Sequence, residues 1–175
     1  IERNENYLQG VQNTLNRNLA FEENSTQSQI LREKLLKRVQ KNPDQPVFAE
    51  MLIWLHLQQK NYTGALIQAK AIDRRLRENG RRLMALARLC VSAGNFEAAV
   101  KCYEYVIEKG PRNLYYVQSK IERLRVLKQK ITTTANYTEE DLQKLESSYF
   151  NSLDEFGNSP ETVSLILDLA HLEAY

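Results

Sequence analysis

The sequence predicts an all-α protein built as a solenoid of antiparallel helical hairpins, with about nine helices. Three observations carry this prediction. Only six Gly and four Pro occur in 175 residues, which is few for a chain rich in β-hairpins and tight turns. Apolar residues recur every three or four positions, as on one face of an amphipathic helix. The whole pattern also repeats with a period of 34 residues.

The repeat is clearest when residues 46–79 are aligned with residues 80–113. Each segment reads as a first apolar helix, a short turn that contains Asn61 or Asn95, and a second amphipathic helix. Neither helix can bury its apolar stripe alone, so the stacking of hairpins completes a shared core. The positions that are identical in the two segments are Leu52 and Leu86, Leu55 and Leu89, Asn61 and Asn95, Ala65 and Ala99, and Asn79 and Asn113.

Beyond the second segment the period breaks. Residues 114–130 are predicted as one longer helix, and the β-branched, polar run 132–137 as a poor helix. Thr138 is predicted to cap the next helix, because acidic residues follow it in the first turn, where the helix dipole favours them. That helix is predicted to end before Gly157, and Pro160 to open the last helix.

We therefore assign the chain to one helical-repeat domain, residues 1–175. After the two clear repeats come an irregular repeat at 114–157 and the start of a further repeat at 160–175. Because the chain begins with Ile1 and its last residues read as helix, we expect it to be part of a longer protein.

The two aligned segments share a residue pattern. It comprises Leu86, Ala87, Cys90, Ala93, Gly94, Asn95, Phe96, Ala99, Tyr103, Val106 and Pro111 in the better copy, and Leu52, Tyr62, Ala65 and Ile72 in the other. This pattern resembles the tetratricopeptide repeat. The other copy departs from it where Lys60 replaces the usual Gly, Ala69 the usual aromatic residue and Arg77 the usual Pro. From the divergence of the repeats we expect a bacterial source.

The resemblance implies a right-handed superhelix in which the first helices of successive repeats line a concave surface. Their residues outside the buried stripe would face a partner. Trp54 and Arg88 would place an aromatic side chain beside a guanidinium group, a pairing favoured at binding hot spots. For Trp54, ordinary packing inside the protein is an equally good interpretation. The candidate partner-binding residues are Glu50, Trp54, Leu57, Gln58, Arg81, Met84, Arg88, Val91, Tyr115, Gln118, Glu122 and Arg125.

Charge is distributed unevenly along the chain. Subtracting Asp and Glu from Lys and Arg gives +1 for residues 1–69, +9 for residues 70–130 and −8 for residues 131–175. One interpretation is a solvated surface, because the outer faces of helices are commonly charged. The other is that the basic block attracts an acidic segment of a partner protein. The opposite charges would also favour weak head-to-tail self-association.

The sequence contains no motif for catalysis or for a cofactor. His56 and His171 are 115 residues apart, and neither has a metal-ligand spacing with Cys, Asp or Glu. His56 is predicted on the buried side of its helix. The six glycines are too far apart to form a phosphate-binding loop. We therefore expect no enzyme activity, no metal and no cofactor.

The two cysteines are predicted to be free thiols. In an antiparallel hairpin with a turn at 92–95, Cys90 faces residue 96, and Cys102 then lies about six residues, or roughly 9 Å, farther along the axis. That separation exceeds the reach of a disulfide. No apolar run is long enough to span a bilayer, so we expect a soluble chain, and the sequence does not distinguish a cytoplasmic from a periplasmic location.

Taken together, these features predict a non-catalytic scaffold for protein–protein interaction that binds a peptide or helix of a partner on its concave face. One alternative is a helical-repeat protein that binds nucleic acid through the basic block 70–130, which we do not favour because Tyr115 and Tyr116 are the only obvious stacking aromatics there. The other alternative is a structural arm of a larger protein.

Overall fold

The computed structural model describes residues 2–18, 25–134, 137–157 and 159–173. These residues form helices, turns and short connections, and they contain no strand. The prediction of an all-α protein is therefore confirmed, and the described residues contain nine helices, as predicted. The chain divides into two compact units, unit 1 (Ile1–Arg77) and unit 2 (Glu78–Tyr175), and each is described by itself.

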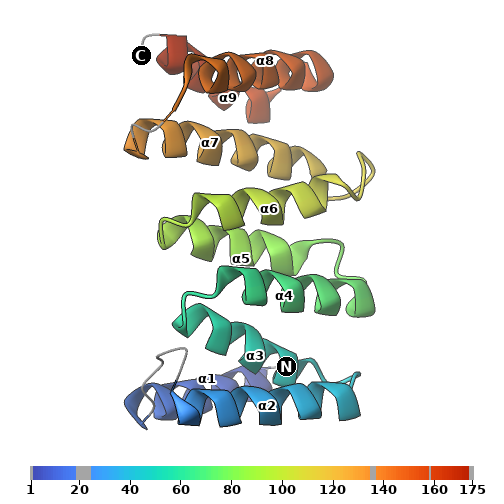
Figure 1. The fold of residues 1–175 in the computed structure, drawn as a ribbon. Coiled ribbons are helices and arrows are strands. Elements are labelled where there is room, and N and C mark those ends of the chain that lie inside the picture. The colour runs from blue at the N-terminus through green and yellow to red at the C-terminus, as the bar shows by residue number, and fades with distance from the viewer. Residues whose placement is uncertain (1, 19–24, 135–136, 158, 174–175) are drawn as a thin grey trace. The chain divides into compact units, whose positions relative to one another are not determined.

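Unit 1 is built around its third helix (Figure 1). This helix packs against the other three, and its residues Leu52 and Leu55 are fully buried in a core that it shares with the second helix. Such sharing is what an amphipathic helix requires, because its apolar stripe can be buried only against a neighbour. The helices of the unit are α1 (Glu2–Asn18), α2 (Thr26–Lys41), α3 (Pro46–Gln58) and α4 (Tyr62–Leu76).

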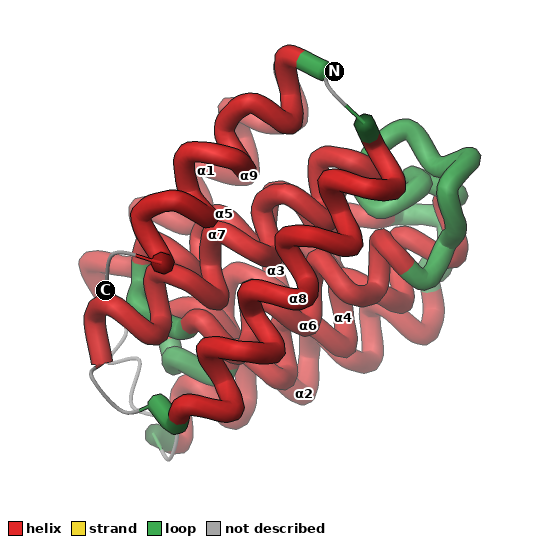
Figure 2. Tube along the Cα trace, turned by 90° about the horizontal axis from the view of Figure 1, so that it is seen from above, coloured by secondary structure: helices red, strands yellow, loops and turns green. Residues whose placement is uncertain are grey.

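Unit 2 arranges five helices in two layers (Figure 2). The first, third and fifth of them lie in one layer, and the second and fourth in the other. Each helix packs against the next one along the chain, and the third also packs against the fifth. The helices are α5 (Arg81–Ser92), α6 (Phe96–Ile107), α7 (Tyr116–Thr134), α8 (Glu139–Phe156) and α9 (Pro160–Glu173).

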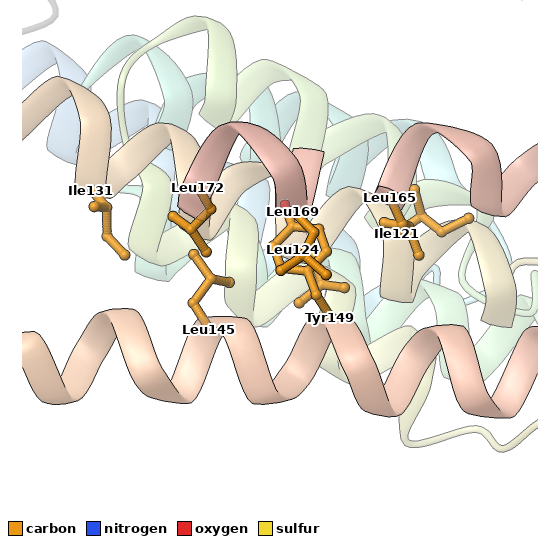
Figure 3. Close-up of a cluster of buried hydrophobic side chains, with 8 residues drawn as sticks. All are labelled: Ile121, Leu124, Ile131, Leu145, Tyr149, Leu165, Leu169 and Leu172. Atoms are coloured by element: carbon orange, nitrogen blue, oxygen red, sulfur yellow. The ribbon is translucent and has the colours of Figure 1, made fainter. Parts of the chain in front are cut away.

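The last three helices of unit 2 share one apolar core (Figure 3). Side chains from α7, α8 and α9 converge there, and Tyr149 and Leu165 are fully buried. Its members are Ile121, Leu124 and Ile131 of α7, Leu145 and Tyr149 of α8, and Leu165, Leu169 and Leu172 of α9.

Both predicted ends of α8 and the predicted start of α9 are confirmed. The Thr138 side chain accepts a hydrogen bond from the backbone N–H of Asp141 at 3.2 Å, and the Asp141 carboxylate accepts one from the backbone N–H of Thr138 at 2.9 Å. This reciprocal arrangement is a capping box. α8 ends at Phe156, directly before Gly157, and α9 begins at Pro160.

Two turns repeat one period apart. Asn61 and Asn95 both cap the helix that follows, because each side-chain oxygen accepts a hydrogen bond from a backbone N–H three residues later. Immediately before them, Lys60 and Gly94 both adopt positive φ, at 54° and 73°. Lys60, which stands where the repeat pattern usually has Gly, therefore lies in a left-handed backbone conformation that favours glycine.

His56 is buried, as predicted, and it packs closely against the start of α4. A Cβ atom added to Gly64 would lie 2.6 Å from Nδ1 of His56. Real Cβ atoms do not approach other atoms so closely, so the absence of a side chain at this position permits the contact between α3 and α4.

The prediction that residues 132–137 form a poor helix is wrong for the first half of this run. Thr132, Thr133 and Thr134 form the last turn of α7. Each hydroxyl group donates a hydrogen bond to the carbonyl oxygen four residues earlier, at 2.5 to 3.1 Å. This local bonding satisfies the polar side chains within the helix. Residues 135 and 136 lie outside the described residues.

The two cysteines are free thiols, as predicted. Cys90 of α5 and Cys102 of α6 are both fully buried free thiols, and their side chains are hydrogen-bonded. The hydrogen bond from Cys102 lowers the pKa of Cys90, although burial acts in the opposite direction.

The unusual conformation of Lys60 predicts a gain in stability from Lys60→Gly. We expect the free energy of unfolding to rise by about 1 kcal/mol, the cost of placing a non-glycine residue in the left-handed region. Chemical denaturation monitored by circular dichroism measures this change. The matched control is Gly94→Lys, which we expect to be destabilising by a similar amount, because no atom obstructs a Cβ there and only the backbone conformation penalises it.

Burial of Cys90 and Cys102 predicts that both thiols are protected in the native chain. In the native chain, a thiol reagent should react with them only as fast as the α5–α6 hairpin opens. In the denatured chain, the same reagent should react with them at once. Time-resolved labelling with an aromatic disulfide reagent measures both rates. Equal rates in native and denatured protein would contradict the packing described above.

Candidate functional site

Unit 2 contains a surface groove between the beginning of α7 and the beginning of α9. The groove encloses about 500 Å³. Its walls combine apolar side chains, which supply contact area, with polar side chains that can fix the orientation of a bound segment. The residues that line it are Leu114, Val117, Gln118, Ile121, Glu122, Arg125, Pro160 and Ser164.

The apolar end of the groove is open to solvent. Leu114, in the turn before α7, is 83% exposed, and Val117 is 37% exposed. Ile121, one helical turn farther along α7, belongs to the core shared with α9, where Figure 3 shows it beside Leu165. The groove therefore runs from the exposed Leu114 to Ile121, whose side chain is buried in the core.

The other end of the groove is charged and internally paired. The Arg125 guanidinium bonds to the Glu122 carboxylate at 2.9 Å and lies 3.6 Å from the Asp168 carboxylate of α9. Asp168 also accepts a hydrogen bond from Lys128 at 2.8 Å. These four side chains balance in charge and connect α7 to α9. They supply donors and acceptors at the rim without a strong net field.

The remaining basic residues of α7 are paired as well. Lys120 bonds to the carboxylate of Glu155 on α8, and Arg123 lies 3.2 Å from Glu104 on α6. Lys130 lies 2.8 Å from Glu97 on α6. The basic block and the acidic C-terminal segment therefore neutralise one another in part within unit 2, which the net charges of the segments do not reveal.

Tyr149 of α8 projects into the core between α7 and α9, beside Leu124 and Leu169 (Figure 3). Its hydroxyl oxygen is buried and has no hydrogen-bond partner among the described residues. Burial raises the pKa of Tyr149, and the Asp168 carboxylate raises it further while Arg125 opposes this. The phenol therefore remains neutral and serves as part of the apolar core.

The structure places the predicted residues of unit 2 in different surroundings. Gln118, Glu122 and Arg125 line the groove, whereas the neighbouring Tyr115 is half-buried outside its lining. Met84 is only 2% exposed, and its sulfur accepts a hydrogen bond from Ser119 of α7 at 3.1 Å. The prediction that Met84 faces a partner is therefore corrected, because this side chain fills the interface between α5 and α7.

The predicted residues on α5 do not line this groove. Arg88 is exposed and Val91 half-buried on that helix. Arg81 is exposed, and its guanidinium lies 3.3 Å from the Glu78 carboxylate. No described groove collects these three side chains, and their role in binding stays a prediction.

The predicted residues of unit 1 all lie on α3. Trp54 is partly buried and packs against the core of the unit, which agrees with the packing interpretation. Glu50 and Leu57 are half-buried, and Gln58 is exposed. The predicted pairing of Trp54 with Arg88 joins residues of the two units and stays a prediction.

Sequence reasoning missed the apolar half of the groove. Leu114, Val117 and Ile121 follow the spacing of a buried stripe, so the sequence pattern assigns them to the core. Pro160 was assigned only as the start of α9, and Ser164 was not singled out. The signal that could have found the groove is the break in the period after residue 113, because an altered helix leaves part of its apolar stripe without a neighbour.

The described residues offer no group of three or more His, Cys, Asp or Glu side chains arranged to hold a metal ion. None of the described helices is both long enough and apolar enough to cross a membrane. No protein-family model matches the chain, and a search of curated proteins finds no significant match. The features of the groove are therefore the basis for a proposal on function.

The contact between Lys120 and Glu155 predicts a pH-dependent contribution to stability. The hydrogen bond from Lys120 lowers the pKa of Glu155 below its ordinary value. A carboxyl group with a lowered folded-state pKa stabilises the protein above its unfolded-state pKa, and this contribution is lost as the pH falls through the folded-state value.

We therefore expect Lys120→Gln to lower the free energy of unfolding at pH 7 by less than about 1 kcal/mol, because the pair is partly exposed. The difference from the parent chain should shrink below the pKa of Glu155, and what is left reports the contacts of Lys120 with the Tyr116 and Phe156 rings. Urea denaturation between pH 2.5 and 7 measures it. Lys144→Gln is the matched control, because its partner Glu140 is more exposed, and a larger effect there would contradict the assignment.

Proposed function

We propose that this chain is a non-catalytic scaffold that binds a peptide or helical segment of another protein in the groove between α7 and α9. The observation that carries the proposal is the composition of this groove, in which the exposed Leu114 and Val117 adjoin the hydrogen-bonding rim of Gln118, Glu122 and Arg125. Apolar contact area with a few polar groups at its edge is the usual make-up of a site for a protein segment.

The rigidity of the groove supports binding of a flexible segment. Its walls belong to α7 and α9, which are joined by the shared apolar core and by the contacts of Asp168 with Arg125 and Lys128. A preformed surface loses little conformational entropy on binding, so more of the contact energy appears as affinity. A solenoid of stacked helical hairpins is preformed in the same way. We therefore also propose that the whole chain is arranged as such a solenoid.

The pairing of the basic side chains on α7 argues against nucleic acid as the ligand. Electrostatic binding to phosphates requires Lys and Arg side chains that exchange counterions for phosphate groups. Here the carboxylates of Glu104, Glu155 and Asp168 already occupy several of them. A protein segment that relies on apolar contacts needs no such exchange.

The test is selection of binding peptides from a displayed random library, followed by fluorescence anisotropy with the selected peptides. We expect Leu114→Asp combined with Val117→Asp to weaken their binding about tenfold or more, because both changes place charge in an apolar contact. Both side chains are accessible to solvent, so circular dichroism should show an unchanged fold. The groove proposal fails if peptides that bind the parent chain bind this variant equally well.

Ile67→Asp is the matched control for this experiment. Ile67 is an exposed apolar residue on α4, in unit 1. The substitution adds the same charge outside the groove and should leave the binding of the selected peptides unchanged.

A further inference from the structure

Unit 1 carries a row of basic side chains along α2. Lys34, Lys37, Arg38 and Lys41 follow the spacing i, i+3, i+4 and i+7, so they share one flank of the helix. All four are exposed, whereas Leu35, on another flank, is buried in the core of the unit. None of the four forms an ion pair among the described residues. We call this row the basic stripe.

The acidic residues nearest to the stripe in the sequence leave it positively charged. Glu33 is the one acidic residue among the 16 residues of α2, and Asp44 follows in the turn before α3. Neither forms an ion pair within the part of the chain that the structure describes. The net charge of +1 for residues 1–69 therefore conceals a strongly basic flank.

Contacts place the stripe beside the other helices of unit 1. The Arg38 guanidinium lies over the Phe48 ring of α3, 5.9 Å from its centroid. Near the end of α4, the Arg75 guanidinium donates a hydrogen bond at 2.7 Å to the carbonyl oxygen of Pro43, two residues after α2. Figure 1 shows the ends of α2 and α4 on the same side of unit 1. Because the Pro43 carbonyl is uncharged, Arg75 keeps its positive charge and extends the stripe.

The helix dipole explains only part of the stripe. Basic residues in the last turn of a helix are stabilised by its dipole, and this turn contains Arg38 and Lys41. Lys34 and Lys37 lie before the last turn, where the effect of the dipole has faded. Like charges four residues apart, as in Lys34 with Arg38 and Lys37 with Lys41, destabilise a helix. A row that weakens its own helix and adds nothing to the core indicates a role in binding.

The packing of another helical hairpin does not fit this flank of α2. Stacked hairpins bury apolar stripes against one another, and the burial of an unpaired Lys or Arg side chain is strongly unfavourable. Any occupant of the stripe must therefore bring negative charge.

The free energies available to different anions favour a nucleic acid. A single ion pair at an exposed surface contributes little, so an acidic protein segment gains little from the stripe alone. A nucleic acid duplex carries condensed counterions, and each phosphate that a Lys or Arg side chain neutralises releases some of them. This gain requires neither an apolar contact nor a pocket.

We propose that the basic stripe binds the phosphate backbone of double-stranded nucleic acid without reading its base sequence. From Lys34 to Lys41 the stripe extends about 10 Å along α2, and Arg75 lengthens it beyond the end of the helix. A duplex presents about one negative charge for every 1.7 Å of its axis. Each basic side chain therefore has a phosphate within its reach.

Two other polyanions fit the stripe less well. A single strand is held by aromatic faces on which its bases stack. Phe48, the ring in contact with the stripe, is half-buried beneath Arg38 and offers no such face. A helix that lies on a membrane needs a broad apolar face. Of the described residues in line with the stripe, Ile30 is the one exposed large apolar side chain.

This proposal goes beyond the one on the groove and does not rest on it. The groove belongs to unit 2, where carboxylates pair with Lys120, Arg123 and Lys128 of α7. The basic side chains of the stripe belong to unit 1 and lack such partners among the described residues. Separate variants can therefore test the two surfaces.

The test is fluorescence anisotropy of the 175-residue chain with a fluorescein-labelled DNA duplex of about 20 base pairs, at salt concentrations from about 50 to 200 mM. We expect the logarithm of the binding constant to fall with the logarithm of the salt concentration with a slope of about −4, because four or five phosphates contribute about 0.9 each. Two duplexes of unrelated sequence should bind equally, and a single strand of the same length more weakly.

The stripe variant is Lys34→Gln combined with Lys37→Gln and Lys41→Gln. It should reduce the steepness of the salt dependence by about 2.7 and weaken duplex binding about tenfold or more at the lowest salt concentration. All three side chains are exposed, so circular dichroism should show an unchanged fold.

The matched control is Lys120→Gln combined with Lys130→Gln and Lys144→Gln. It removes the same charge from lysines that are each paired with a carboxylate. It should leave the affinity for the duplex and its salt dependence nearly unchanged.

Equal weakening by the stripe variant and the control would show that only the net charge of the chain matters and would overturn the proposal. So would the absence of duplex binding at the lowest salt concentration. Poly-glutamate and vesicles of anionic phospholipid are the competing probes. Tighter binding to either of them than to the duplex, lost in the stripe variant, would assign the stripe to an acidic protein or a membrane and would also overturn the proposal.

Discussion

The structure of unit 2 depends on α7 being buried on more than one side. This helix packs against α6, α8 and α9, and its Ile121, Leu124 and Ile131 enter the core shared by the last three helices. Burial of such side chains contributes roughly 1.5–3 kcal/mol each, which makes the core the main stabilising term. The ion pairs of Lys120 with Glu155 of α8 and of Lys128 with Asp168 of α9 then help to fix how these two helices are positioned.

Local patterns predicted the helical part of the fold well. The turns at Asn61 and Asn95 and the cap at Thr138 depend on residues within a few positions of one another, so their physics is contained in a short stretch of chain. The last turn of α7 escaped the same reasoning. Three threonines read as helix-breaking by propensity, but their hydroxyl groups bond back to the helix itself.

The candidate groove was predicted only at its polar rim. Gln118, Glu122 and Arg125 were named because the resemblance places the first helix of each repeat on a binding surface, and these three residues lie outside the buried stripe of that helix. The apolar wall was missed because the sequence pattern does not distinguish a leucine covered by a neighbour from one left open, as Leu114 is. Prediction from charge has the same limit. The net charge of each segment of the sequence does not reveal that Lys128 and Arg125 share Asp168 as a partner.

The contact between His56 and Gly64 has a consequence for how this hairpin can vary. The imidazole fills the space that any side chain at position 64 would need, so neither residue can change freely while the other is present. A smaller residue at 56 would open room for alanine at 64, and alanine there would strengthen the first turn of α4. The two positions therefore form a coupled pair, and in homologous chains a bulkier residue at one should accompany a smaller residue at the other.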